Sequence, residues 1–512
     1  MAIDSATQLL RSLQHVHAYP HAVDGEIQVI ETHISWVFLA GNYAYKIKKP
    51  IRTSFLDYTT LAMRKQYCEE ELRLNKRFAA DLYLGMVAIV DNNGHLFIDR
   101  CGEPVEYAVQ MKRFPANSLL SDRLEHGMVT LRHVRQLAGG IADFHQSAAQ
   151  AEVESQFGSP DLIYAEALDN LREIVSVKIG RLAPPVELLQ VWTAEHFESY
   201  REAFHSRKLG GHIRECHGDL HLGNIVEWND GLIPFDGIEF CDEFRWIDTL
   251  SDAAFTAMDF AAHGRMDFCH SFINAYLEAT GDYGSIPVLQ WYLVYRAMVR
   301  AKVAAIRFSQ TESNPFAHSE AEDDIATLLS LAQRLSVAGK ARSRLWITHG
   351  VSGSGKTTGS EQVVQRHGAI RIRADVERKR LVGLEPNDRF SKGDERHASL
   401  YTDEMTTRTY QRLVELAEEI IQAGTSVIVD ATFLLKGQRC LFRDLAGRLQ
   451  VPFHILAFHA EPATLRQRIA DRIAEHQDAS DADLAILDSQ LERQHLLDDD
   501  ELKLTVPNVN EP

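Results

Sequence analysis

Three polar residues within positions 216–240 have the types and spacing that phosphoryl transfer requires. Asp219 follows a His-Gly pair, Asn224 comes five residues later, and Asp236 lies beyond a second short β-prone run. A carboxylate can accept the proton of a hydroxyl acceptor, while an amide oxygen and a second carboxylate can hold the Mg²⁺ of ATP. We therefore predict that Asp219 is a catalytic base and that Asn224 and Asp236 are metal ligands. The alternative, a polar hairpin with ordinary turn residues, is disfavoured because His-Gly-Asp, Gly-Asn and Phe-Asp-Gly recur so closely.

A second phosphate-binding pattern begins at Gly350, where residues 350–357 match G-x-x-x-x-G-K-[ST]. A short apolar run precedes this motif and a helical pattern follows it, which is the context that a P-loop needs. Backbone N–H groups of such a loop cradle phosphates, the lysine reaches the β and γ phosphates, and the hydroxyl after it binds Mg²⁺. We predict a nucleotide site formed by Gly350, Ser352, Gly353, Ser354, Gly355, Lys356, Thr357 and Thr358, with Thr357 also a metal ligand.

Carboxylates follow the next two apolar runs of this region. Asp375 comes after the run 369–372, and Asp430 comes after the run 426–429. Ligands of parallel α/β sheets bind at the carboxyl ends of the strands. We predict that Asp430 binds Mg²⁺ through water, that Asp375 meets the acceptor hydroxyl as a catalytic residue, and that Arg378 binds an acidic group of the substrate.

Two arginines share one face of the helix expected at residues 462–472. Arg468 and Arg472 are four positions apart, so both can close over the phosphates as a catalytic lid. A pair of surface arginines is the alternative interpretation of the same spacing.

A lysine near the N-terminus has the position of a phosphate-binding group. Residues 31–49 predict a hairpin with a Gly-Asn turn at Gly41, which places Lys46 on the second strand. Lys48 has the same strand parity and is a rival for this role. The helix expected at residues 61–80 carries three consecutive glutamates, of which Glu71 shares a face with apolar residues and is the predicted partner of the lysine.

Other elements must position these groups. Residues 106–114 predict a strand, and residues 130–147 and 249–262 predict helices. Asp248 and Asp252 stand at the start of the last helix, where carboxylates cap backbone N–H groups and can also brace the catalytic loop. We interpret His145 as a structural residue.

The alternation of strands and helices changes near residue 340. A linker at residues 338–343 separates the first part from a parallel α/β pattern. We predict an α+β bilobal kinase domain at residues 1–340 and an α/β P-loop domain with a parallel sheet at residues 341–512.

The motifs of the first part resemble those of the aminoglycoside phosphotransferase family, which has a protein-kinase-like fold. The resemblance rests on HGDLHLGNI at residues 217–225 with Asp236, and on ETHISWVF, AYKIKKP, EEELRLN and IEFCDEFRWID, which resemble a bacterial branch fused to a P-loop kinase. It implies Asp219 as the base, Asn224 and Asp236 as Mg²⁺ ligands, Lys46 as the phosphate-binding lysine and Glu71 as its partner. One departure is that Gly41–Asn42 is the only candidate for a glycine-rich phosphate loop.

The second part resembles the P-loop kinases that include polynucleotide 5′-hydroxyl kinase, gluconate kinase and zeta-toxin relatives. The resemblance rests on the P-loop, on D-x-x-R from Asp375 to Arg378, on VIVDAT around Asp430 and on the lid pattern. It implies the reaction class but leaves the acceptor open, because the acceptor varies most within this group.

Charge and cysteine usage limit the choice of partners. The net charge is −18, of which residues 341–512 contribute −4 (23 basic and 27 acidic residues) and residues 1–340 contribute −14. This balance disfavours broad nucleic-acid or anionic-membrane binding by the first part. The sequence has no run of about 18 apolar residues and no C-x-x-C pair, so we expect a cytoplasmic protein with reduced thiols.

Together these patterns predict an ATP- and Mg²⁺-dependent phosphotransferase with two nucleotide sites, each acting on a hydroxyl of a small molecule. Two alternatives stay open. One half could be a nucleotide-binding regulatory module, or the second half could phosphorylate nucleic-acid 5′-hydroxyl ends through its basic cluster, residues 371–380. The sequence leaves the oligomeric state open.

Overall fold

The computed structural model describes residues 2–53, 56–229, 231–311, 313–337, 343–385, 388, 400, 402–475 and 484–506. The chain divides into two compact units that interleave along the sequence. The first unit comprises Met1–Leu162 with Arg207–Thr256, and the second comprises Ile163–Ser206 with Ala257–Pro512. The predicted domain border near residue 340 lies outside the described residues, so the two predicted domain ranges stay a prediction.

An antiparallel sheet of six strands forms one side of the first unit, with the order β1-β2-β3-β6-β4-β5. Its β2 and β3 strands make the predicted hairpin, and the predicted strand before Pro115 is β6 in the middle of the sheet. The strands are β1 (Gln28–Glu31), β2 (Ser35–Ala40), β3 (Tyr43–Lys48), β4 (Tyr83–Asn92), β5 (His95–Ile98) and β6 (Pro104–Lys112).

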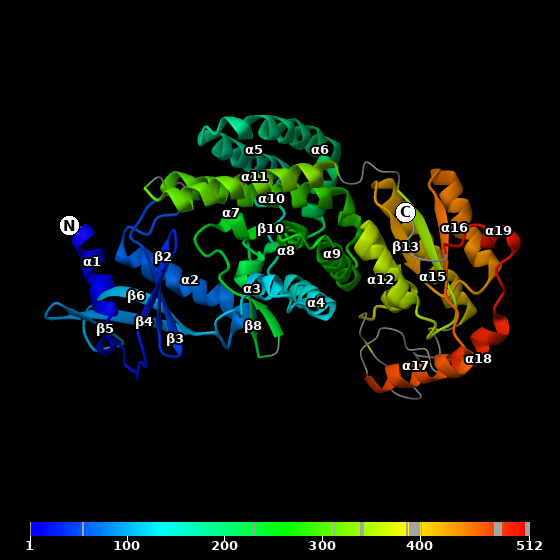
Figure 1. Cartoon of the computed structure of the whole chain (residues 1–512), viewed down its shortest axis with the longest axis horizontal. Helices are drawn as coiled ribbons and strands as arrows, with labels where there is room; N and C mark the ends of the chain where they lie inside the picture. Colours follow the sequence, from blue (N-terminus) through cyan, green and yellow to red (C-terminus); the bar gives the residue numbers. More distant parts are fainter. Residues whose placement is uncertain are drawn as a thin grey trace. The chain divides into compact units, whose positions relative to one another are not determined.

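The two faces of this sheet have different roles because successive side chains of a strand alternate between them. Tyr45 and Ile47 of β3 belong to the apolar cluster that includes Leu9 and Leu13 of helix α1 (Ala2–Leu13). Ala44 belongs to the cluster on the other face, against which α2 (Leu61–Ala79) packs (Figure 1). Lys46 and Lys48 have the parity of Ala44, so the β3 lysines face α2.

Short strands and turns carry the loop with Asp219. The antiparallel pair β7 and β10 brackets it, and the β8–β9 hairpin separates it from Asp236. The remaining elements of this unit are η1 (Val16–Ala18), α3 (Leu120–Glu125), α4 (Leu131–Ser147), β7 (Ile213–Glu215), η3 (Leu222–Asn224), β8 (Ile225–Trp228), β9 (Gly231–Pro234), α7 (Asp242–Arg245) and β10 (Trp246–Asp248).

Long helices begin the second unit, and three of them cross a border between the units along the chain. Those three are α5 (Pro160–Ser176), α6 (Ala183–Leu209) and α8 (Thr249–Ala262). Helices α10 and α11 run side by side (Figure 1). The other elements are η2 (Gly180–Leu182), α9 (Met266–Thr280), η4 (Tyr283–Ser285), α10 (Ile286–Gln310) and α11 (Pro315–Val337).

A parallel sheet of four strands, with the order β12-β13-β11-β14, completes the second unit. Helices follow the strands, as in other α/β folds. The strands are β11 (Leu345–His349), β12 (Ile370–Arg373), β13 (Val427–Asp430) and β14 (Phe453–Ala457), and the helices are α12 (Lys356–His367), α13 (Ala374–Arg380), α15 (Asp403–Gln422), α16 (Lys436–Leu449), α17 (Pro462–Glu475), α18 (Leu484–Arg493) and α19 (Asp499–Leu502).

The predicted fold classes are confirmed. An antiparallel sheet with its α2 helix comes first in the chain, and a parallel sheet with alternating helices comes last. Within the described part of the chain, none of the helices combines the length and apolar character needed to span a membrane.

Candidate active sites

The loop that carries Asp219 depends on the glycine before it. Gly218 has φ +89°, and a Cβ at this position would lie 2.6 Å from the backbone oxygen of Phe244. Only glycine adopts this conformation without strain in so close an approach. The Asp219 side chain is 38% exposed, so its carboxylate is accessible while the loop below it is packed.

Asn224 lies directly beside Asp219. Its Nδ2 donates to the backbone oxygen and to the Oδ2 of Asp219, each at 2.9 Å. The amide nitrogen is therefore used in holding the carboxylate, and the amide oxygen is the atom that can bind a cation. The structure thus brings together the predicted base and one predicted metal ligand.

Asp236 is held in a left-handed conformation, φ 62°, after the β8–β9 hairpin. Its backbone N–H donates to the hydroxyl of Tyr83 at 3.0 Å, and the N–H of Gly237 donates to Oδ1 of Asn75 at 2.9 Å. A non-glycine residue in this region indicates a conformation that its surroundings impose. Asn75 and Tyr83 belong to α2 and β4, and the sequence reasoning missed both.

Lys46 and Glu71 form the predicted ion pair. Lys46 Nζ donates to Glu71 Oε1 at 2.9 Å, and it also pairs with Asp236 Oδ1. Burial alone would lower the pKa of Lys46, but the carboxylates of Asp236 and Glu71 raise it well above its usual value. The structure therefore brings a charged lysine to the carboxylate that we predict as a metal ligand.

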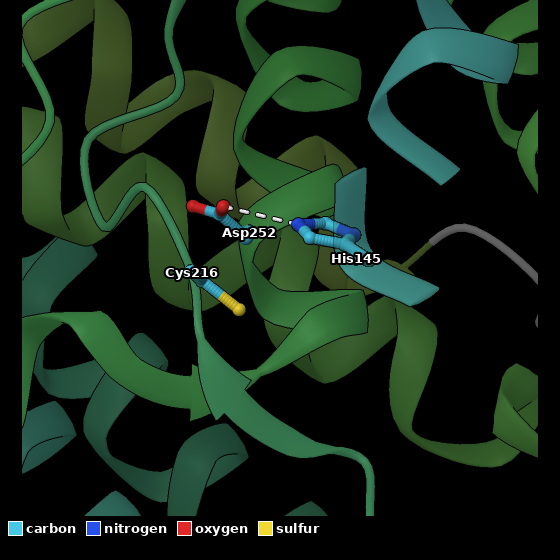
Figure 2. Close-up of side chains that lie close together, drawn as sticks. All are labelled: His145, Cys216 and Asp252. Carbon is cyan, nitrogen blue, oxygen red and sulfur yellow. Dashed lines mark hydrogen bonds and ion pairs between the residues drawn. The ribbon is translucent and has the colours of Figure 1, made fainter. Parts of the chain in front are cut away.

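Asp252 braces this loop through its carboxylate, and its side chain lies near His145 and Cys216 (Figure 2). Its Oδ2 accepts the N–H of His217 at 2.9 Å, its Oδ1 accepts the N–H of Gly218 at 3.0 Å, and His145 Nε2 lies 3.2 Å from Oδ2. Cys216 is close enough for the three side chains to be considered as a metal site. Because the Asp252 oxygens already accept bonds from the loop, we interpret the cluster as structural support, in agreement with the structural role expected for His145.

His217 connects the loop to the strand before Asp236. Its Nδ1 lies 3.2 Å from the backbone nitrogen of Asp219, and its Nε2 lies 2.8 Å from the backbone oxygen of Phe235. These partners are satisfied by the neutral tautomer that carries its proton on Nε2. Burial lowers the pKa of His217, although the Asp252 carboxylate opposes this shift.

The P-loop in the second unit joins β11 to α12. Gly350, Gly353 and Gly355 all have positive φ, and a Cβ on Gly350 would lie 2.5 Å from the backbone oxygen of Phe458. Their lack of side chains is therefore what lets the loop adopt this path. Lys356 Nζ donates to the backbone oxygen of Val351 at 2.8 Å.

A cavity of about 1070 Å³ opens beside this loop. The predicted residues that line it are Ser352, Gly353, Ser354, Gly355, Lys356, Thr357, Thr358, Asp375, Arg378, Asp430 and Arg468. Asp430 ends β13, and its Oδ2 accepts the hydroxyl of Ser360 at 3.1 Å. The carboxyl ends of β12 and β13 thus place Asp375 and Asp430 on the same cavity, as expected for a parallel sheet.

The predicted arginines differ in their surroundings. Arg468 Nη1 donates to the backbone oxygen of Gly353 at 3.2 Å, which places it over the P-loop. Arg378 lines the cavity, but its Nη1 donates to the backbone oxygen of Leu400 at 2.8 Å. The side chain of Arg472 lies outside the described residues.

Sequence patterns did not identify two further residues that contribute to the site in the second unit. Gln490 of α18 lines the cavity, and its Oε1 accepts the N–H of Ser352 at 2.8 Å. Glu278 of α9 pairs with Arg373, a cavity residue, at 2.9 Å. Both belong to helices far from the motifs in sequence, so periodicity offered no signal for either role.

Known proteins resemble most of the chain, and a family model matches its P-loop region. A family model described as an AAA domain matches residues 345–497. Over 474 residues the chain is 31% identical to the uncharacterized protein Rv2004c of Mycobacterium tuberculosis, and equally to the uncharacterized protein Mb2027c of Mycobacterium bovis, with 90% of each chain covered. The chain belongs to the family of these mycobacterial proteins.

Solved structures of kinases are similar to single parts of the chain. An amicoumacin kinase is 12% identical, with a TM-score of 0.40, and the match covers 66% of this chain and 96% of that one. A choline/ethanolamine kinase family protein from Mesorhizobium loti is 12% identical, with a TM-score of 0.34 and coverages of 65% and 100%. A gluconokinase from Sinorhizobium meliloti is 20% identical, with a TM-score of 0.23 and coverages of 33% and 85%.

The predicted enzyme class is confirmed at its coarse level. The family match falls on the P-loop and the strands around it, in line with the predicted phosphotransferase that uses ATP with Mg²⁺. The donor sets fit this cofactor, because carboxylate, amide and hydroxyl oxygens are the ligands that Mg²⁺ prefers.

The neutral state of His217 predicts a pH effect on stability. The unfolded histidine titrates near pH ~6.5, and the folded pKa is lower. Between the two pKa values the unfolded state therefore binds more protons than the folded state. The contribution of His217 to the free energy of unfolding is fully present above pH ~6.5 and decreases, by up to ~1.4 kcal/mol per pH unit, as the pH falls toward the folded pKa. Thermal unfolding of wild type and His217→Gln between pH 5 and 7.5 measures the difference. Glutamine can donate and accept like the neutral imidazole, so an equal pH dependence in both proteins would contradict this prediction.

The hydrogen bonds that Asp252 accepts from the loop predict that Asp252→Asn strongly destabilises the protein. Both oxygens of Asp252 accept hydrogen bonds, whereas asparagine has only one oxygen. Its NH₂ group would therefore face an N–H donor of the loop or of His145, and that hydrogen bond would be lost. We expect the free energy of unfolding to fall by about 2–4 kcal/mol. Asp143→Asn on the exposed side of α4 is the control, with a change within about 0.5 kcal/mol. Chemical denaturation measures both variants, and equal effects would contradict the proposed brace.

Proposed function

We propose that the protein is a bifunctional kinase with two separate active sites, each of which transfers the γ-phosphate of ATP to a hydroxyl of a small molecule. One observation carries this proposal. Each unit brings together a lysine, several oxygen donors and a further carboxylate, to which we assign the phosphates, Mg²⁺ and the acceptor hydroxyl, respectively.

In the first unit, Asp219 would accept the proton of the acceptor hydroxyl. Its accessible carboxylate and its bonds from Asn224 support this role, because a base must be oriented before it can act. Asn224 and Asp236 would hold the metal, and Lys46, positioned by Glu71, would bind the phosphates. Mg²⁺ supplies neutralisation of the phosphate charge.

In the second unit, Lys356 and the P-loop N–H groups would bind the phosphates, with Thr357 and Asp430 as ligands of the metal. Asp375 would receive the acceptor hydroxyl, and Arg468 over Gly353 would stabilise the transferred phosphoryl group. Arg378 and Arg373 lie on the same cavity, and their charge favours an acceptor with an acidic group. We keep the Arg472 lid role only as a prediction.

The nucleic-acid alternative is disfavoured by the environment of its basic cluster. None of Arg371, Arg373, Arg378, Lys379 and Arg380 is an exposed residue. Arg371 pairs with Glu361 and Glu278, and Arg380 pairs with Glu377. Binding of a phosphate backbone requires accessible cations that release counterions, so a small-molecule acceptor fits this unit better.

A cytoplasmic location is also part of the proposal. All six cysteines are free thiols, among them the buried Cys68, Cys216 and Cys269. Thiols persist in reducing compartments.

Two variants test the two-site proposal. Asp219→Asn and Lys356→Ala should each abolish a different phosphorylated product, with a rate loss of at least about 100-fold, because each removes a group of one site only. The measurement is a metabolite screen by mass shift of one phosphate, with full-length protein, ATP and Mg²⁺. Asp143→Asn should retain both products.

The regulatory alternative predicts a different result. One variant would then abolish all turnover, and the other would alter only its dependence on nucleotide concentration. If neither variant changed any product, the proposal of two active sites would be wrong.

A further inference from the structure

A second buried lysine lies beside Lys46 on the same face of β3. The Lys48 side chain is 1% exposed, and its Nζ donates to Glu71 Oε2 at 2.8 Å. It also pairs with Glu239, which accepts the hydroxyl of Tyr58 at 2.6 Å. Lys48 is therefore part of the same ion-pair network as Lys46.

The Glu71 carboxylate is shared between the two lysines. Oε1 accepts from Lys46 at 2.9 Å, and Oε2 accepts from Lys48 at 2.8 Å. The network runs from Asp236 through Lys46, Glu71 and Lys48 to Glu239. It contains three carboxylates and two ammonium groups, a formal net charge of −1.

The burial of Glu71 explains why its carboxylate needs both lysines. Glu71 has no solvent exposure, and a buried carboxylate that loses its counter-ion is strongly destabilised. Two of the three N–H donors of Lys46 are engaged with Asp236 and Glu71. If Asp236 turns to a metal ion, its place on Lys46 can pass to a phosphate. Glu71 needs a cation that does not take part in this exchange. Lys48 meets that need, because its other partner, Glu239, is 3% exposed and Tyr58 is fully buried.

We propose that Lys48 is a positioning residue of the first active site. It is the permanent counter-ion of Glu71, and it frees Lys46 to exchange Asp236 for a nucleotide phosphate. Glu239 and Tyr58 hold Lys48 in place. This role rests on the proposed function of the first unit, and it differs from the phosphate-binding role for which Lys48 was a rival in the sequence.

Nucleotide binding in a double-mutant cycle tests the role. The probe is a fluorescent N-methylanthraniloyl ATP with Mg²⁺, and every variant carries Lys356→Ala so that the P-loop site contributes little. Lys48→Met should weaken binding by about tenfold, because Lys46 is then the only cation left for Glu71. In a Glu71→Gln background the same change should alter affinity by less than about twofold, since the charge that needs Lys48 is gone.

A purely structural Lys48 would give another pattern. Equal losses in the two backgrounds, or no loss in either, would overturn the proposal. Lys49→Met is the matched control, because the neighbouring Lys49 pairs with the exposed Glu31 and should leave affinity unchanged.

Two further variants separate failure of folding and failure of the proposed function from failure of this inference. Lys48→Met takes the lysine away from Glu239, and the double variant Lys48→Met/Glu239→Gln also removes the negative charge of Glu239. It should melt at a higher temperature than Lys48→Met and still bind the probe about tenfold more weakly than Glu239→Gln. Affinity equal to that of Glu239→Gln would overturn the proposal.

Lys46→Met should abolish binding at this site. If it does not, the function proposed for the first unit is wrong, whereas loss with Lys46→Met alone refutes only the role of Lys48.

Discussion

A carboxylate without solvent contact stays ionised only where cations or N–H donors replace the lost water, and the first unit is organised around this requirement at Glu71. Two lysines from one strand meet its two oxygens, and they connect α2 and β3 to the segment that carries Asp236 and Glu239. Burial would raise the pKa of Glu71, but the two ammonium groups lower it. Breaking one partner of such a network leaves an uncompensated charge, which is far more damaging than the loss of a surface pair. The network thus ties the sheet to the catalytic segment through charges that cannot be removed singly.

The loop with Asp219 meets the same constraint with backbone groups. Asp252 has no solvent exposure, and the N–H groups of His217 and Gly218 point at its carboxylate. The loop conformation is therefore set by groups that do not touch the reacting atoms. Such support is what keeps a base within the narrow geometry that proton transfer needs.

Local patterns predicted most elements, whereas tertiary contacts determined the detail of the sites. The β2–β3 hairpin, α2, α8 and the strands β11 to β13 follow from alternation, helical spacing and glycine turns, and so their chemistry-bearing residues could be named. Glu71 could be chosen from three adjacent glutamates because its helix face is apolar. Glu239, Gln490 and Glu278 could not be found in this way. Each reaches its site through folding of segments that are distant in sequence, and a single charged residue in a helix or loop is most often a surface residue.

The groups that we propose to bind nucleotide are held by different physical means in the two units. In the second unit, glycines with positive φ turn the P-loop backbone toward the cavity, so much of the phosphate site is already formed by N–H groups. In the first unit, the β1–β2 turn at residues 32–34 has no glycine, and the glycine at residue 41 packs its turn against Ala22. Side-chain charge must then provide what backbone N–H groups provide elsewhere. We propose that an ammonium group bonded to two carboxylates provides this charge by exchanging one of them for a phosphate, and that the other carboxylate tolerates the exchange because it keeps a second cation.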